Sequence, residues 1–310
     1  DGKGMKMSKS MGNVIAPEDI LKNYGADILR VWATASDYSE DLRIDKNILI
    51  QHAESYRKIR NTFRFMLGNL KDNFEKQDFK KIDLSEFDEL EQYILHKLYV
   101  IDVSVSENLK SYNFHKLYKE LLKFCTLDLS SFYFDIRKDV LYCDGLNSKK
   151  RKNCVIVLNI ILESLLKWFA PILVFTCEEI YSLINNKNES IHEKDFVKIP
   201  GNWQNPKLDE KWSNLFKIKQ EANVAIEEKR TNKEIGSSLE AEIKLILKKE
   251  KFELLNDLDL AEYFIVSKAE KEMSSSDKIK IQVNKAKGIK CERCWKILEN
   301  KCERCSNLAG

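Results

Sequence analysis

The chain has 310 residues, a length that predicts two or three structural units. Its hydrophobic content of 43% and charged content of 33% are typical of a soluble globular protein. A net charge of only +3 excludes a uniformly basic, polyanion-binding chain. The amino end is charged and has no apolar run, so no signal peptide is predicted. Because the sequence begins with Asp1 rather than Met, it could be a piece of something longer.

The first motif in chain order is the string K-M-S-K-S at residues 6–10, which lies between Gly4 and Gly12. The lysine ammonium groups are mobile charges for phosphate oxygens, and the serine hydroxyls add hydrogen-bond donors. The flanking glycines allow the segment to fold over an anionic ligand. The string therefore predicts a phosphate-binding loop, and the alternative is a solvated lysine-rich loop.

The next 200 residues carry apolar side chains every three or four positions, which predicts helices joined by short polar loops. The predicted helices cover 17–24, 26–35, 47–70, 86–110, 114–137, two segments within 154–185 broken near Pro171, and 208–230. Gly68 and the polar stretch 72–81 are predicted to end the third of these. Successive long helices of this kind predict a helical bundle. Polar residues interrupt the apolar stretch 154–177, so it is predicted as core helix, with a membrane span as the remote alternative.

The pattern changes after Pro200-Gly201. Apolar residues alternate with charged ones over 241–247 and again over 279–283, which is strand periodicity. The serine-rich segment 273–277 is predicted as a loop between elements. Together with the helix at 208–230, these segments predict a small α+β unit.

Four of the eight cysteines form two pairs near the carboxyl end, Cys291/Cys294 and Cys302/Cys305, with seven residues between the pairs. Four thiolates at this spacing are typical of a closed tetrahedral zinc site. A redox dithiol pair or an iron–sulfur cluster are the alternatives. We expect one structural zinc per chain, because so short a segment needs metal ligation to fold. The other four cysteines lie in or near apolar runs, and the whole pattern favours a reducing cytoplasm.

Residues 278–310 carry nine Lys or Arg against three Glu, a local excess of basic residues. Such a patch is the footprint of a nucleic-acid contact, and a solvated face is the competing interpretation. Within it, Arg293 is a candidate phosphate contact. Trp295 could stack on a base or simply cover one side of the metal.

Several strings now resemble one family. K-M-S-K-S resembles the signature loop of class I aminoacyl-tRNA synthetases. The strings G-A-D-I-L-R at 25–30, S-Y-R-K-I-R-N-T at 55–62, G-S-S-L-E-A at 236–241 and C-E-R-C-W at 291–295 resemble the isoleucyl-tRNA synthetase family of bacterial type. The resemblance covers essentially the whole chain in the family's order. The valine, leucine and methionine relatives share the loop and the helical domain, but not this four-cysteine tail.

The resemblance implies roles for individual residues. Lys9 would be the main ligand of the transferring phosphates of ATP, with Lys6 assisting and with Ser8 and Ser10 beside it. Arg57, Arg60 and Arg64 share one helix face and would contact tRNA phosphates, as would Arg137 and Lys138. For each of these five, a solvated helix face is the alternative. The implied partners are tRNA-Ile, isoleucine and ATP with Mg²⁺.

The same resemblance predicts the architecture. The fold class is mainly α: a helical anticodon-binding domain, preceded by the end of a Rossmann-type catalytic domain and followed by a small α+β unit and a zinc knuckle. The predicted boundaries are 1–45, 46–200, 201–287 and 288–310. The implied activity is ATP-dependent charging of tRNA with isoleucine through an aminoacyl adenylate. We expect a cytoplasmic monomer with no membrane contact.

One departure from the family pattern affects mechanism. The histidine–glycine ATP motif, the amino-acid pocket and the editing domain are absent from these 310 residues. We therefore expect that the chain cannot activate isoleucine alone. A non-catalytic tRNA-binding module is the second hypothesis, although such a module has no need of the Lys9 loop. A zinc-ribbon DNA-binding protein is the third, and it leaves the loop and the bundle unexplained.

Overall fold

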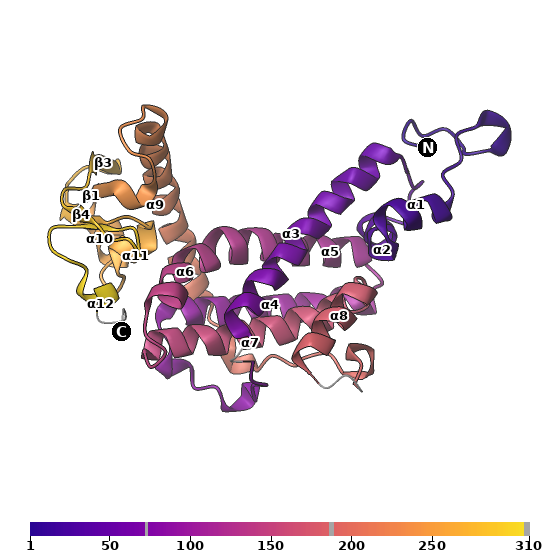
Figure 1. The fold of residues 1–310 in the computed structure, drawn as a ribbon, viewed down its shortest axis with the longest axis horizontal. Helices are drawn as coiled ribbons and strands as arrows, with labels where there is room; N and C mark the ends of the chain where they lie inside the picture. Colours follow the sequence, from indigo (N-terminus) through magenta and orange to yellow (C-terminus); the bar gives the residue numbers. More distant parts are fainter. Residues whose placement is uncertain (72–73, 186–188, 307–310) are drawn as a thin grey trace. The chain divides into compact units, whose positions relative to one another are not determined.

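The computed structural model describes residues 1–71, 74–185 and 189–306. Its contacts divide the chain into two compact units. The first unit comprises Asp1–Tyr133 with Asn153–Gln204, and the second comprises Phe134–Lys152 with the chain from Asn205 onward. Figure 1 traces both units in the colours of the sequence. The predicted division into four domains stays a prediction.

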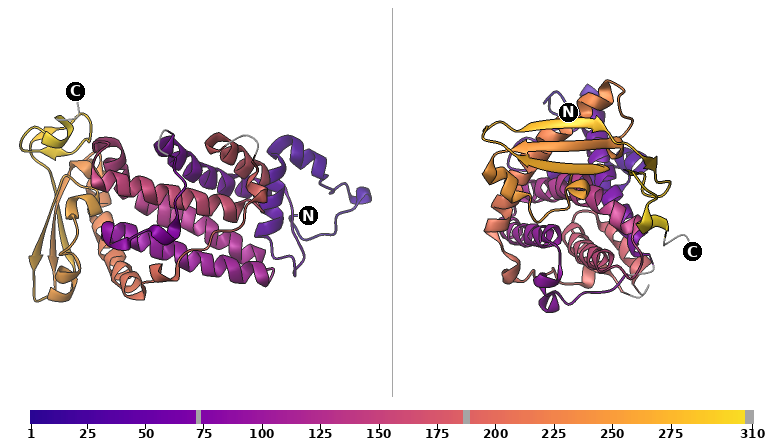
Figure 2. Two further views of the ribbon diagram at one scale, coloured as in Figure 1. Left: turned by 90° about the horizontal axis from the view of Figure 1, so that it is seen from below. Right: turned by 90° about the vertical axis from the view of Figure 1, so that its left-hand side faces the viewer.

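The first unit is a bundle of helices, whose long members lie side by side in both views of Figure 2. Its α-helices are α1 (Pro17–Tyr24), α2 (Ala26–Ala35), α3 (Lys46–Leu70), α4 (Glu89–Lys110), α5 (Phe114–Lys123), most of α7 (Lys149–Phe169) and α8 (Val174–Ile184). Its short 3-10 turns are η1 (Lys9–Met11), η2 (Phe79–Lys81), η3 (Leu84–Glu86), η5 (Ile191–Glu193) and η6 (Gly201–Trp203).

The ends of these helices follow ordinary capping rules. Pro17 occupies the first turn of α1, and the Asp45 carboxylate accepts the N–H of Ile48 at 2.7 Å to cap α3. The break predicted near Pro171 is confirmed, because α7 ends at Phe169 and α8 begins at Val174. The helix end predicted at Gly68 and the polar stretch 72–81 is confirmed, because the last residue of α3 is Leu70. Since one exposed glycine costs a helix only about 1 kcal/mol, the packing of α3 carries it on to Leu70.

The single helix predicted for 114–137 is wrong. A π-helical stretch, η4 (Phe124–Tyr133), separates α5 from α6 (Phe134–Cys143). The Ser130 hydroxyl donates to the carbonyl of Cys125 at 2.8 Å, and Ser131 donates to that of Thr126 at 2.9 Å. Both hydrogen bonds join residues five positions apart, which is the i to i+5 spacing of a π-helix. Apolar periodicity alone does not reveal this spacing.

The second unit combines helices with two small sheets. Its helices are α6, α9 (Pro206–Thr231), η7 (Ser238–Glu240), α10 (Lys249–Leu254), α11 (Leu260–Phe264) and α12 (Glu303–Ser306). Its strands are β1 (Ala241–Leu247), β2 (Lys268–Met273), β3 (Lys280–Lys285), β4 (Ile289–Lys290) and β5 (Ile297–Leu298). Strand β1 lies between β2, which runs parallel to it, and β3, which runs antiparallel. β4 and β5 form a separate antiparallel hairpin.

The sheet partly matches the sequence prediction. Ile243, Leu245 and Leu247 of β1 are completely buried, as their alternation with charged residues predicts. The edge strand β2 was missed, because K-A-E-K-E-M contains no apolar alternation. Met273, predicted to open a loop, is the last residue of that strand. The mainly helical fold class is confirmed. Over the described residues, no helix is long and apolar enough to span a membrane.

Candidate metal centre and anion-binding surfaces

The K-M-S-K-S loop precedes α1 and is organised by its own polar side chains. The backbone N–H of Ser8 donates to Oδ1 of Asn13 at 2.9 Å, while Nδ2 of Asn13 donates to the Asp1 carboxylate at 2.9 Å. The Ser8 hydroxyl caps the short turn η1 by accepting the N–H of Met11 at 3.3 Å. Gly12 then takes a left-handed conformation with φ of 67° and ends the turn.

The two lysines of this loop point into solvent. Lys6 and Lys9 are both exposed, and within the described part of the chain neither forms an ion pair. Ser10 is exposed beside them, and its hydroxyl lies 3.1 Å from that of Ser8. The loop thus presents two uncompensated ammonium groups and two hydroxyls around one short turn. This arrangement suits a polyphosphate, whose charge would neutralise both lysines.

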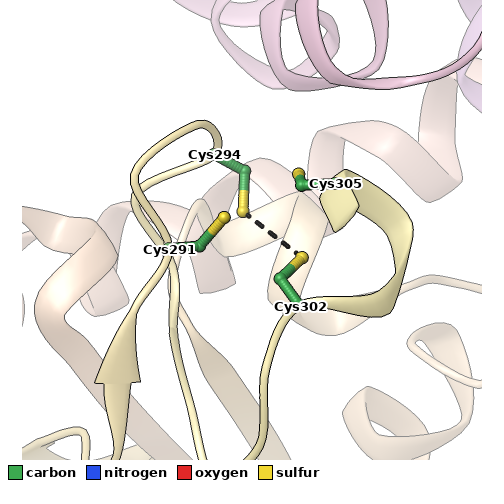
Figure 3. Close-up of side chains that lie close together, drawn as sticks. All are labelled: Cys291, Cys294, Cys302 and Cys305. Carbon is green, nitrogen blue, oxygen red and sulfur yellow. Dashed lines mark hydrogen bonds between the residues drawn. The ribbon is translucent and has the colours of Figure 1, made fainter. Parts of the chain in front are cut away.

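The structure brings all four predicted metal ligands together. The sulfur atoms of Cys291, Cys294, Cys302 and Cys305 lie within 4.8 Å of one another (Figure 3). The first pair lies at the tip of the β4–β5 hairpin, and the second pair brackets the start of α12. Sγ of Cys294 and Sγ of Cys302 are 3.9 Å apart. A tetrahedral zinc with bonds of about 2.3 Å separates its sulfurs by about 3.8 Å, so the residues fit a closed zinc site.

The hairpin around the first pair is held tightly. The N–H of Cys291 donates to the carbonyl of Lys296 at 2.9 Å, and that of Trp295 donates to the carbonyl of Cys291 at 2.9 Å. Gly288 has a φ of +128°, and a Cβ there would meet the carbonyl oxygen of Leu298 at 2.1 Å. Only glycine therefore permits the close strand approach that closes this knuckle.

The thiols of the cluster differ in acidity. Although burial opposes ionisation, the backbone N–H groups of Cys294 and Arg293 lower the pKa of the Cys291 thiol to about 7. Burial raises the pKa of Cys305, and its neighbouring thiols raise it further. A metal ion would remove this difference, because it binds all four sulfurs as thiolates.

A fifth cysteine, Cys143 at the end of α6, packs against this cluster. It is buried, and its Sγ donates to the carbonyl of Arg293 at 3.9 Å. Its apolar sequence neighbourhood predicts only a buried core cysteine, so this contact was not predicted. Its sequence position, just before a turn, does not indicate which distant residues pack against it.

The arginines of α3 form an exposed face. Arg57, Arg60 and Arg64 are all exposed on one side of the helix, as their spacing predicts. None of the three forms an ion pair within the residues that the structure describes. Arg60 and Arg64 line a groove of about 520 Å³ between α3 and α8, with Ile180 and Leu183 on its other side. Such a face has the charge that a phosphate backbone requires.

The remaining two candidates differ from this pattern. Arg137 is only 3% exposed, and its guanidinium pairs with the Glu262 carboxylate at 2.7 Å. It therefore has no access to a phosphate, and we remove it from the candidate contacts. Lys138 is partly exposed and pairs with Asp135 at 2.5 Å, so it stays a candidate. The sequence could not distinguish these neighbours, because adjacent residues of a helix face different sides.

Comparison with known families finds two that match separate parts of the chain. The family described as the anticodon-binding domain of tRNA ligase matches residues 91–245, half of the chain. The chain belongs to this tRNA ligase family. A second family, tRNA synthetases class I (I, L, M and V), matches residues 1–45, which include the K-M-S-K-S loop.

Similar tRNA ligases cover nearly the whole chain. The isoleucine–tRNA ligase of Pelagibacter ubique is 58% identical over 99% of this chain and 34% of its own length. That of Gluconobacter oxydans is 40% identical over 100% of this chain and 33% of its own length. The resemblance to isoleucyl-tRNA synthetases is thus confirmed. The chain spans about a third of the length of these relatives.

The fold of the tRNA ligase family is also found among solved structures. The ternary complex of Agrobacterium radiobacter K84 agnB2 LeuRS with tRNA and LeuAMS superposes with a TM-score of 0.52. It covers 80% of this chain and 24% of the LeuRS chain, at 16% identity. At that identity the similarity concerns the fold alone.

Proposed function

We propose that this chain is part of an isoleucine–tRNA ligase, in which it supplies the ATP-closing loop, a tRNA-binding bundle and a zinc knuckle. The observation that carries the proposal is the exposed, uncompensated pair Lys6 and Lys9, in the same unit as the exposed arginine face of α3. The lysine pair suits a polyphosphate, and the arginine face suits a nucleic-acid backbone. Isoleucine–tRNA ligases align with 99–100% of the chain, at 40–58% identity.

In the proposed activation step, isoleucine attacks the α-phosphorus of ATP, and pyrophosphate leaves. Lys9 would contact the transferring phosphates and Lys6 would assist, since positive charge stabilises the charge that develops in the transition state. Ser8 and Ser10 would donate hydrogen bonds, and Mg²⁺ would accompany ATP. The flexible glycines on either side, Gly4 and Gly12, would let the loop close.

The tRNA would contact the bundle and the knuckle. Arg57, Arg60 and Arg64 would neutralise backbone phosphates, and Lys138 and Arg293 would add weaker contacts. Trp295, with its exposed indole, would stack on a base of an unpaired loop. Zinc would contribute structure only, because cysteines would occupy all four of its ligand positions and leave none for a substrate or water. We further propose a monomer acting in the cytoplasm.

The test is filter binding of this chain to tRNA-Ile and, side by side, tRNA-Val. We expect tighter binding of tRNA-Ile, with an affinity that falls as salt rises. A variant with Arg57, Arg60 and Arg64 changed to Gln should bind both tRNAs more weakly and with a smaller salt slope. Lys116, Lys119 and Lys123 changed to Gln on α5 serve as a matched charge control. Equal, salt-insensitive binding by all proteins would contradict the proposal.

A further inference from the structure

The K-M-S-K-S loop is closed at its base by a contact between two polar side chains, those of Asp1 and Asn13. Nδ2 of Asn13 donates to Oδ2 of the Asp1 carboxylate at 2.9 Å, so this bond joins residues twelve positions apart. Both side chains belong to partly buried residues, whereas Lys6 and Lys9 are exposed. The contact is therefore sheltered, while the two ammonium groups of the loop face solvent.

Asn13 also holds the backbone that carries both lysines. Its Oδ1 accepts the N–H of Ser8 at 2.9 Å, and its Nδ2 donates to the carbonyl of Lys6 at 3.3 Å. One side-chain amide thus binds the backbone on both sides of Met7, and Lys9 follows Ser8 directly. Because a lysine is a point charge on a flexible stem, the position of its backbone determines where its charge can reach.

Asp1 is the only acidic residue in the segment 1–17, and its carboxylate is engaged by amide groups. Oδ1 accepts the backbone N–H groups of Lys3 at 3.0 Å and Met5 at 2.9 Å, while Oδ2 accepts from Asn13. These bonds direct the one nearby negative charge at amides rather than at the ammonium groups of the loop. The positive charge of the loop is therefore left for an anionic ligand.

Gly2 places the base of the loop against the start of α3. A Cβ on Gly2 would collide with the carboxylate of Asp45. That carboxylate caps α3 by accepting the N–H of Ile48 at 2.7 Å, so it cannot move aside without loss of the cap. Glycine at position 2 thus lets the chain beside Asp1 approach a fixed helix end, which supports the contact between Asp1 and Asn13.

We propose that Asn13 and Asp1 are positioning residues for adenylate formation, because they hold the loop backbone so that its two lysines meet the phosphates of ATP in one defined geometry. The proposal rests on the proposed function above and names the side chains that act through Lys6 and Lys9. Neither Asn13 nor Asp1 touches the nucleotide. Charge that is already in place stabilises the transition state without reorganisation, and a displacement of about 1 Å can lower a rate about 10²-fold.

The first test measures isoleucine-dependent pyrophosphate exchange in a polypeptide of the relatives' length that contains this chain. Asn13→Ala should lower kcat about 10- to 100-fold, because the lysines lose their common support. The KM for ATP should change by less than about threefold, since the lost interaction belongs to the transition state. Asn23→Ala is the matched control. Asn23, on α1, also donates to a backbone carbonyl, that of Asp19 at 2.8 Å, and its loss should leave kcat unchanged.

The second test exchanges the two side chains. Asn13→Asp alone sets two carboxylates against each other, and Asp1→Asn alone gives the pair one N–H donor too many, so each should lower kcat as Asn13→Ala does. The double variant Asp1→Asn with Asn13→Asp restores one donor facing one acceptor, with the direction of the bond reversed. It should recover kcat to within about tenfold of the original, the remainder being the lost bond to the Lys6 carbonyl.

A third measurement follows the loop itself in this chain, by limited digestion with trypsin and mass spectrometry. Cleavage after Lys6 and Lys9 should be about 3- to 10-fold faster in Asn13→Ala, because two hydrogen bonds that restrain the loop are lost. The double variant should be cleaved more slowly than either single variant. Circular dichroism checks that the helices of each variant are intact, so that faster cleavage reports on the loop alone.

The outcomes separate this proposal from the proposed function. Faster cleavage of Asn13→Ala with an unchanged kcat would show that the contact only stabilises the loop, which overturns the positioning role. No recovery in the double variant would overturn the direct pairing of Asp1 with Asn13. A loss of rate in Lys9→Ala beside a normal rate in Asn13→Ala would leave the proposed function intact. An unaltered rate in Lys9→Ala would contradict the proposed role of the loop, and the positioning role with it.

Discussion

Asp27 of α2 caps the start of α8 by accepting the N–H of Thr176 at 2.9 Å and its hydroxyl at 2.6 Å. One turn later, Arg30 donates to the carbonyls of Pro171 at 2.6 Å and Ile172 at 3.0 Å. A single turn of α2 therefore satisfies the polar groups left open where α7 ends and α8 begins. The negative group meets the helix N-terminus and the positive group meets the carbonyls, as helix dipoles favour.

Replacing Asp27 tests this junction. Because the carboxylate is buried and accepts several bonds, Asp27→Ala should lower the free energy of unfolding by about 1–3 kcal/mol. Asp19→Ala removes an exposed carboxylate from α1 and should change it by no more than about 0.5 kcal/mol. Urea denaturation measures both. Equal stability of the two variants would show that the junction does not depend on the Asp27 cap.

The buried ion pair of Arg137 and Glu262 gives a second prediction. Both side chains are nearly inaccessible, and Lys150 pairs with the same carboxylate. Glu262→Ala should lower the free energy of unfolding by about 3–5 kcal/mol, because it leaves a buried guanidinium without this partner. Lys150→Ala should cost much less, since that ammonium is partly exposed. A small effect of Glu262→Ala in urea denaturation would mean that water or another group compensates Arg137.

Arg137 and Cys143 also show where sequence reasoning stops. The helices and the four-cysteine site followed from periodicity and spacing, which are local properties. Whether Arg137 faces solvent or Glu262 depends on contacts between residues 125 positions apart. The same holds for Cys143, which meets a cluster about 150 residues later. Local patterns contain no information on such pairings.

Strand β2 was missed for a related reason. Its residues are mostly charged, because both the strand edge and much of its faces are exposed. What defines it as a strand is its register with β1, where Ala269 pairs with Ile243 and Lys271 with Leu245. The prediction of β1 succeeded since its buried residues alternate strictly. Edge strands of this kind depend on a neighbour rather than on their own pattern.

Lys9 should matter for the rate of activation. In a polypeptide of the relatives' length that contains this chain, Lys9→Ala should lower the rate of isoleucine-dependent pyrophosphate exchange about 10²- to 10³-fold, as for loss of one transition-state contact. The KM for ATP should change much less. Lys22→Ala on α1 removes a nearby exposed lysine and should leave the rate unchanged. An unaltered rate for Lys9→Ala would refute its proposed role.

Removal of metal should act locally. We expect about one zinc per chain, and a strong chelator should loosen residues 288–306 while the helices of the first unit stay folded. Hydrogen exchange followed by mass spectrometry would locate the change. Cys294→Ser should lose zinc, whereas Cys143→Ser should retain it, because Cys143 only packs against the four ligands. Loss of zinc from Cys143→Ser to the same extent would show that it is itself a ligand.

Lys219 of α9 predicts how stability depends on pH. Its side chain is buried, its ammonium donates to the carbonyl of Tyr263, and burial lowers its pKa from 10.5 to about 8. Below pH 8, Lys219 is charged in both states, and burial of that charge destabilises the folded chain. From pH 8 to 10.5, Lys219 binds more protons in the unfolded chain than in the folded chain. The free energy of unfolding should therefore rise with pH across this window, by at most about 3 kcal/mol from this group.

A comparison of variants isolates that contribution from other titrating groups. Lys219→Met removes the charge while keeping a long apolar side chain, so its stability relative to the original chain should be highest near pH 7 and should fall as pH rises from 8 to 10.5. The contacts of the ammonium with the Tyr263 and Phe264 rings offset part of the cost at neutral pH. Lys217→Met, on the exposed side of the same helix, should show no such trend. Parallel pH profiles for Lys219→Met and the original chain would show that Lys219 stays protonated throughout this range in the folded protein.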